Sequence, residues 1–229
     1  MAGGVPVVYR SGGSNAVASY SYTDLAEGTG IVKLYAGGLQ DANGIKYRLQ
    51  KTAFNTSTTS PAVNQRHTQA STTSTSFSKL IDLDFDTTTF NLPQTVSGTL
   101  LANIPYASFN NGANTTSSYC NLNIIKVASD GTTETNLVTI SSATMVSDTD
   151  SSRDVYFAFE ANVPVTNIAK GEKLRINPEI WTKTTSGTVY VTLMYDPQDA
   201  TLTMDSPATT VVAAGKTAMN FHVPFRIDL

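Results

Sequence analysis

The sequence predicts an all-β protein, an antiparallel β-sandwich of jelly-roll-like type with extra strands at its N-terminal end. Short runs rich in Val, Ile, Tyr, Phe and Thr recur throughout the 229 residues, separated by Gly, Asn, Asp and Pro. No ten-residue segment shows the apolar period of a helix. Charged residues are 14% of the chain, against about 25% in typical soluble domains. This composition favours strands and packed interfaces over exposed helices.

The N-terminal part, residues 1–54, is expected to form strands or an arm that packs on the main domain. Its strand-like runs are "VPVVYR" (5–10), "AVASYSYTD" (16–24), "GIVKLYAG" (30–37) and "GIKYRLQ" (44–50). The last two flank Asn43-Gly44, a pair that readily supplies the positive φ of a tight hairpin turn. A hairpin is therefore predicted here.

Residues 55–76, "NTSTTSPAVNQRHTQASTTSTS", carry almost no apolar side chains. The segment is predicted to be a polar loop or linker between the N-terminal strands and the main domain. The alternative is an arm that becomes ordered against a neighbouring molecule.

Residues 77–229 are predicted to be the sandwich itself. Eight runs alternate or are continuously apolar: "FSKLIDLDF", "TVSGTLLANI", "SYCNLNIIKVAS", "TNLVTISSATMV", "DVYFAFEANV", "KLRINPEIW", "GTVYVTLMYD" and "MNFHVPFRIDL". Eight is the number of strands in a jelly roll of two Greek keys. The sequence has no repeat of fixed period, which argues against a propeller or a solenoid.

The stretch "KLIDLDFD" places aspartates at every second position, Asp82, Asp84 and Asp86. Because side chains alternate along a strand, the apolar residues between them face the core and the aspartates face solvent or a partner. Carboxylates two residues apart lie about 6.5–7 Å from each other, which is wide for sharing one ion. The wet face of a strand is the preferred interpretation over a calcium site or a catalytic pair.

A second acidic stretch, "SDTDSSRD", contains the weak calcium candidates Asp148, Asp150 and Asp154. Carboxylates with loop spacing can wrap calcium together with hydroxyl and carbonyl oxygens. The glycine and terminal glutamate of an EF-hand loop are missing, so a turn is preferred. No metal or other cofactor is expected.

Catalytic motifs are scarce. The two histidines, His67 and His222, have no nucleophile pattern beside them, and Cys120 is expected to be a small buried hydrophobe. The chain is therefore predicted not to be an enzyme. The alternative is a glycoside-acting enzyme that pairs Asp84 with Glu160 or Glu179.

Trp181, the only tryptophan, has the same strand parity as Arg175 and Glu179 in "RINPEIW". These residues form a possible ligand or interface site, either a stacking platform for a glycan or an interface contact. Pro178 could reverse the parity through a bulge.

The net charge of −3 comes without a cluster of Lys or Arg, so nucleic-acid binding is not expected. No stretch approaches the ~20 apolar residues of a membrane span, and the N-terminus does not read as a signal peptide. Synthesis in a host cytoplasm without membrane association is the expectation.

The stretches "VPVVYRSGG…SYTDLAEGTGIVKLYAG", "KLIDLDFDTTTFNLP" and "KLRINPEIW…GTVYVTLMYDPQ" resemble jelly-roll virion structural proteins of tailed bacteriophages. That family includes capsid decoration, collar and tail-associated proteins. The resemblance implies a virion component without enzymatic activity that is commonly oligomeric. No functional residue carries over from it.

The predicted function is that of a viral structural protein that docks on other virion subunits and forms a homo-oligomer in the virion. The alternative is a carbohydrate-binding or receptor-binding module at a virion tip.

Overall fold

The computed structural model of the chain confirms the all-β prediction. It describes residues 29–41, 44–53, 66–111, 114–147, 153–200, 202–205, 210–213 and 217–226. The described residues form strands without a helix. The predicted strands 5–10 and 16–24 lie outside them.

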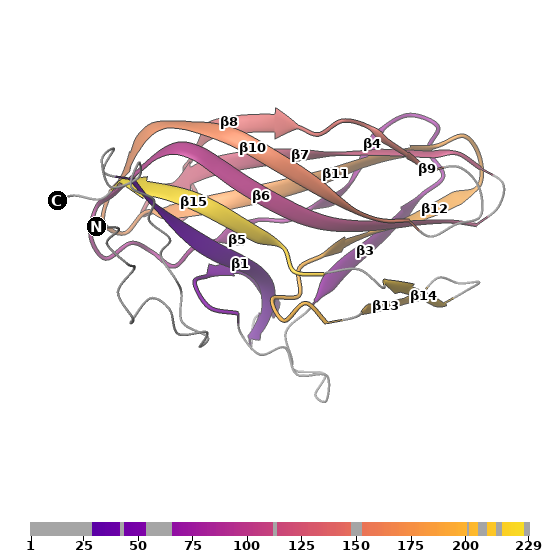
Figure 1. Ribbon diagram of the computed structural model, residues 1–229, viewed down its shortest axis with the longest axis horizontal. Coiled ribbons are helices and arrows are strands. Elements are labelled where there is room, and N and C mark those ends of the chain that lie inside the picture. Colours follow the sequence, from indigo (N-terminus) through magenta and orange to yellow (C-terminus); the bar gives the residue numbers. More distant parts are fainter. Residues whose placement is uncertain are drawn as a thin grey trace, which may run out of the picture.

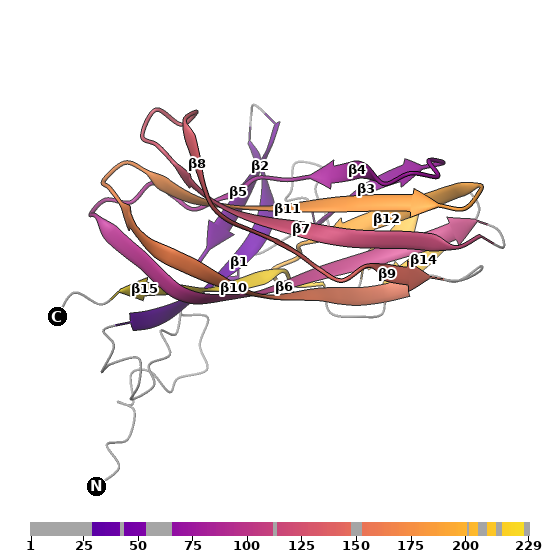
Figure 2. The same ribbon diagram turned by 90° about the horizontal axis from the view of Figure 1, so that it is seen from above.

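Thirteen strands belong to one hydrogen-bonded sheet that folds into two packed layers (Figures 1 and 2). The front layer contains β10 (Arg153–Ile168), β6 (Gln94–Asn111), β15 (Asn220–Arg226) and β1 (Thr29–Asp41). Strand β12 (Thr188–Met194) pairs with the C-terminal part of β6, and β3 (His67–Thr72) pairs with β12. The back layer contains β8 (Glu134–Ser141), β9 (Met145–Ser147), β7 (Thr116–Val127), β11 (Lys173–Thr184), β4 (Ser78–Asp82) and β5 (Phe85–Asp86). A separate hairpin joins β13 (Leu202–Asp205) and β14 (Thr210–Ala213).

Strand β2 (Gly44–Gln50) links the two layers. It pairs with β1 in antiparallel register, with Asp41 opposite Gly44, and meets β5 at one parallel bridge between Arg48 and Asp86. Gly44 has a φ of 113°, which agrees with the hairpin predicted from Asn43-Gly44. The antiparallel layers make a β-sandwich; the finer jelly-roll topology stays a prediction.

The core between the layers follows the period-2 pattern of the sequence. In β11, Leu174, Ile176 and Ile180 are fully buried, and Leu122 and Ile124 of β7 are buried beside them. Since the residues between them are mainly polar and face outward, β7 and β11 each present an apolar inner face and a polar outer face over this stretch.

Pro178 lies inside β11 and does not reverse its parity. Its carbonyl accepts a hydrogen bond from the Leu83 amide (3.5 Å). The N–H and C=O of one strand residue point to the same side, so the proline nitrogen also faces Leu83. There the neighbouring strand is interrupted between β4 and β5, and the donor that proline lacks is not needed.

Residues 67–72 differ from the polar loop expected over 55–76, since they form β3. It pairs with β12 from His67–Met194 to Thr72–Val189. A polar segment can form an edge strand because its pairing uses backbone groups, which every non-proline residue has. Residues 54–65 lie outside the described part.

Candidate functional site

The outer face of the back layer carries the charged residues that the sequence singled out. We call this set the ladder; it comprises Lys79, Asp82, Asp84 and Asp86 with Arg175, Asn177, Glu179 and Trp181. The parity prediction is confirmed for β11, whose polar residues share this face. The burial of Ile81, Leu83 and Phe85 also follows the prediction.

Arg175 holds the most buried part of the ladder. Its Nε and Nη2 donate to the two carboxylate oxygens of Asp86 at 2.6 and 3.0 Å, and its Nη1 donates to Asp84 at 2.8 Å and to Glu134. These interactions, led by the hydrogen bonds to Asp86, raise the pKa of Arg175. The side chains of Arg175 and Asp86 are only 14% and 12% exposed. The prediction that all three aspartates face solvent is therefore wrong for Asp86, whereas Asp82 and Asp84 are exposed.

Asn177 connects the other two aspartates. Its Nδ2 donates to Asp82 at 2.6 Å and to Asp84 at 2.8 Å, while its Oδ1 accepts from Asn123 at 2.9 Å. One amide group thus lies between the two carboxylates and donates to both. The aspartates act as acceptors for protein donors.

The third part of the ladder surrounds Trp181. Its Nε1 donates to Glu179 at 3.0 Å, and its ring stacks on Tyr119 with centroids 6.1 Å apart and planes at 4°. Lys79 bridges Glu179 at 3.0 Å and Asp82 at 2.5 Å. Tyr119 occupies one side of the indole, so at most one ring face is open to a glycan. A ligand role for Trp181, Arg175 and Glu179 stays a prediction.

The structure assembles no metal site among the residues that it describes: no three His, Cys, Asp or Glu side chains converge there. Asp148 and Asp150 lie outside the described residues. Asp154 lies in β10, but its side chain is not described. The calcium prediction is therefore not tested.

The other chemically active residues are dispersed. Cys120 is buried in β7, and this burial raises the pKa of its thiol above the ordinary value. His67 begins β3, and His222 lies in β15. Glu160 belongs to β10 in the front layer, away from Asp84 in the back layer, so the pairing of Asp84 with Glu160 is not formed.

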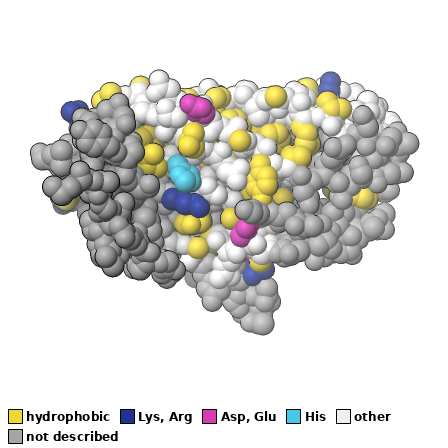
Figure 3. All heavy atoms as spheres, viewed as in Figure 1, with side chains coloured by type: hydrophobic (Ala, Val, Ile, Leu, Met, Phe, Trp, Pro, Cys, Tyr) yellow, Lys and Arg dark blue, Asp and Glu magenta, His cyan; other side chains and the backbone are white. Residues whose placement is uncertain are grey.

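The outward side chains of the front layer form a second surface, which we call the front face (Figure 3). They are Tyr156, Ala158, Glu160 and Asn162 of β10; Thr99, Leu101 and Asn103 of β6; Asn220 and His222 of β15; and Lys33 and Tyr35 of β1. Among these residues only Glu160 and Lys33 are charged. Leu101 and Tyr156 are 45% and 39% exposed.

Pairing across the four strands places Glu160, Leu101, His222 and Lys33 in one row. Partial burial lowers the pKa of His222, and the charge of Lys33 lowers it further. His222 is therefore neutral at pH 7, which leaves the row with one positive and one negative end.

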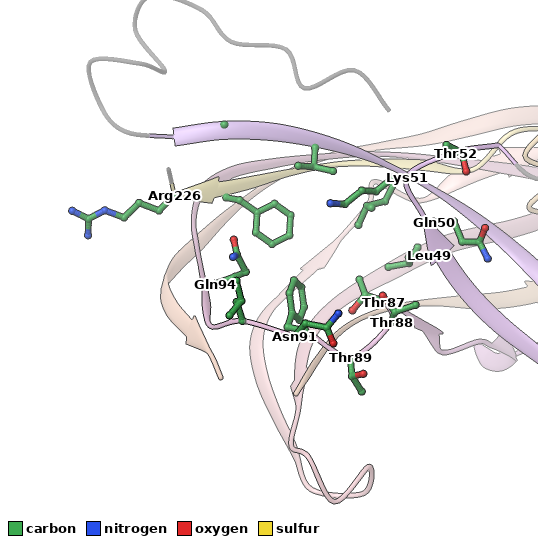
Figure 4. Close-up of a pocket in the computed structure, with 16 residues that line it drawn as sticks. Leu49, Gln50, Lys51, Thr52, Thr87, Thr88, Thr89, Asn91, Gln94 and Arg226 are labelled. Atoms are coloured by element: carbon green, nitrogen blue, oxygen red, sulfur yellow. The ribbon is translucent and has the colours of Figure 1, made fainter. Parts of the chain in front are cut away.

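A cavity of about 750 Å³ opens between β1, β2, β15 and the segment that connects β5 to β6 (Figure 4). Its apolar floor includes Val32, Leu34 and Leu49. Its polar lining comes mainly from residues 50–52 and from Thr87 to Gln94. Sequence reasoning missed this cavity because its walls come from four separate chain segments, each of ordinary composition.

Neither a family model nor a curated protein sequence matches this chain. Solved structures do match. They include an α-amino acid ester hydrolase (9% identity, TM-score 0.45) and an aminopeptidase from a Thaumarchaeota archaeon (8%, 0.48). The chain aligns over 84% of its length with 36% of each hydrolase, so it spans about a third of these proteins.

A further match is the structure of infectious bursal disease virus, Gt strain. It has 12% identity and a TM-score of 0.28 over 94% of this chain and 56% of the viral one. The VP2 protein of the same virus matches at 13% identity and a TM-score of 0.24, over 88% of this chain and 50% of that one.

The hydrolase matches contradict the prediction that the chain is not an enzyme, and that prediction is withdrawn. The absence of a familiar catalytic motif was too weak a ground for it, because catalytic groups can converge from distant segments. Similarity at 8–13% identity concerns the fold and assigns no activity to this chain. In the described part of the chain, no helix is long and apolar enough to cross a membrane.

Proposed function

We propose that the chain is a structural protein of a virus particle that docks on neighbouring subunits through the front face. The single observation that carries this proposal is the composition of that face. Protein interfaces are depleted in charge at their centre and enriched in Tyr and other large side chains. The front face has the exposed Leu101 near its middle, the exposed Tyr156 on its edge strand β10, and only two charged residues among those named above.

The contrast between the front face and the outer face of the back layer also supports docking through the front face. There the outward residues are charged and paired with each other, as in a solvated surface. The front face has few such pairs, so a partner could cover it without stripping water from many ions.

The particular virus class and position remain part of the proposal. The resemblance to tailed-bacteriophage proteins favours a capsid decoration, collar or tail component. Self-association into a homo-oligomer is a further prediction, which sedimentation of the purified chain measures directly. We also propose that residues 1–15 and 55–76 contribute to the docking.

The test is incorporation of the chain into particles assembled from the structural proteins encoded beside it. Leu101→Glu places a second carboxylate opposite Glu160 on the front face, and we expect incorporation to fall at least about tenfold. Val146→Glu is the matched control, since Val146 is 52% exposed in β9 of the back layer. Equal incorporation of both folded variants would exclude docking through the front face.

A further inference from the structure

The cavity beside β2 has walls that are held in place before any ligand arrives. Thr87 makes two hydrogen bonds with Leu174 of β11: its amide donates to the Leu174 carbonyl (2.9 Å), and its side-chain hydroxyl accepts from the Leu174 amide (3.1 Å). Phe90 makes two backbone hydrogen bonds with the turn that precedes β11: its amide donates to the Glu172 carbonyl (3.0 Å), and its carbonyl accepts from the Gly171 amide (2.8 Å). A fixed wall lowers the entropy cost of binding.

Four polar side chains around the cavity have no partner among the described residues. No hydrogen bond or ion pair within that part of the chain engages the side chains of Gln50, Lys51, Asn91 or Gln94. Figure 4 shows Lys51 and Gln94 extending from opposite sides toward the space between them, whereas Arg226 points away from it. The cavity is thus provided with free amides and one inward ammonium group.

The charge and the shape of the lining limit which ligands would fit the cavity. The described lining contains no carboxylate, so the Lys51 charge is not neutralised from within the cavity. Phe90 and Phe225 form an aromatic corner, with centroids 6.0 Å apart and planes at 52°. A volume of about 750 Å³ falls in the range of roughly 300–1,000 Å³ typical of small-molecule sites.

We propose that this cavity binds an acidic sugar. Lys51 would pair with the carboxylate, the amides and the hydroxyls of Thr88 and Thr89 would meet the sugar hydroxyls, and the aromatic corner would cover the apolar side of the ring. An aliphatic acid fits less well, because it would satisfy Lys51 but leave the amides without partners.

This site is separate from the front face and from the ladder. It does not rest on the docking proposal: a folded protein that fails to enter particles can still bind the sugar, and the reverse also holds. It differs from the stacking platform expected at Trp181, which lies on the outer face of the back layer.

The experiment is a titration of the ¹⁵N-labelled full chain with D-glucuronate, D-glucose and octanoate, followed by amide chemical shifts. Glucuronate is expected to shift amides of residues 87–94 and to bind at least about tenfold more tightly than glucose, as one charge-assisted hydrogen bond provides. Lys51→Gln should remove that preference, and Gln94→Leu should weaken both sugars. Thermal melts establish that the variants are folded.

Two control variants have substitutions at positions outside the cavity. Lys183→Gln alters a lysine about 30 Å further along β11 from Leu174, at ~3.3 Å per residue, and should bind like the unaltered chain. Trp181→Ala tests the ladder. The proposal is overturned if octanoate binds more tightly than glucuronate, if Lys51→Gln binds unchanged, or if sugar binding is lost in Trp181→Ala alone. It is also overturned if no amide of residues 87–94 shifts at millimolar glucuronate.

Discussion

The ladder and the cavity use similar polar side chains in opposite ways. In the ladder, Arg175 and Asn177 donate to all three aspartates, and Lys79 joins Asp82 to Glu179. Around the cavity, Lys51 and Gln94 have no partner among the described residues. Both regions lie at the surface of the same sandwich.

The difference shows why an acidic cluster in sequence is a poor guide to a binding site. Opposite charges on adjacent strands satisfy each other and leave little to offer a ligand. Lys51 lies on a connecting segment and has no strand neighbour opposite it, and Gln94 begins β6 opposite the apolar Ile168, so both side chains remain available. Substitutions should therefore affect stability in the ladder and ligand binding in the cavity.

The largest effect is expected for Arg175→Met. This change leaves Asp86, which is 12% exposed, without its bidentate partner. Breaking a mostly buried pair in this way costs roughly 3 kcal/mol, which Lys173 at 3.4 Å from Asp86 reduces in part. Urea unfolding measures the loss.

The companion variant is Arg175→Met with Asp86→Leu. Removing both charges relieves the unpaired carboxylate, so the double variant should recover at least about half of the lost free energy of unfolding. Additive losses would show that Arg175 stabilises the sheet by packing and not by its charge.

A smaller loss is expected for Asn177→Ala. The substitution removes the donor that Asp82 and Asp84 share. The repulsion between the two carboxylates is then no longer offset by a hydrogen-bond donor between them. One to two kcal/mol is the expected order, as for a buried hydrogen-bonding group. Asn123→Ala removes only neutral contacts, those with Asn177 and with Thr139, and serves as the control; the same loss in both variants would contradict the bridging role.

Lys79→Ala should lower stability by about 0.5 kcal/mol at pH 7, because the group is exposed and its ion pairs are screened. Burial acts to raise the pKa of Asp82, but the hydrogen bonds from Lys79 and Asn177 and the charge of Lys79 together lower it below 3.8. A carboxyl with a lowered folded pKa stabilises above pH 3.8 and loses this contribution as pH falls through its folded pKa.

The difference between the unaltered chain and Lys79→Ala should therefore be present at pH 7 and shrink as the pH falls below 3.8 through the lowered pKa of Asp82. Unfolding curves at a series of pH values measure it. A difference that is independent of pH would assign the effect of Lys79 to its aliphatic chain.

The smallest effect on stability is expected for Lys51→Gln. A surface residue without a partner changes the free energy of unfolding by no more than about 0.5 kcal/mol. The same urea measurement that detects Arg175→Met checks this. A loss above 1 kcal/mol would mean that Lys51 is a structural residue like those of the ladder.

Much of the back layer could be predicted from residue alternation. Ile81, Leu83 and Phe85 are buried as expected, and Arg175, Asn177, Glu179 and Trp181 share the opposite face of β11. Alternation failed at Asp86, which follows the same pattern but is covered by Arg175. Its burial depends on a residue 89 positions away in the chain.

Strand β3 illustrates a second limit of the pattern. All of its side chains except Ala70 are polar, and it is held by backbone pairing with β12 and by the hydroxyl contact of Thr68 with Tyr195 (2.8 Å). An edge strand needs a neighbour more than it needs apolar residues. Local composition therefore could not distinguish it from a loop.

The order of amino acids was sufficient to determine that the chain is all-β and which side of most strands faces the core, because both follow from local geometry with a period of two residues. The sequence alone did not predict which strands pair with each other. The neutralisation of the aspartates, the low charge of the front face and the cavity beside Lys51 all arise where segments distant in the chain come together, and only the folded arrangement brings them into contact.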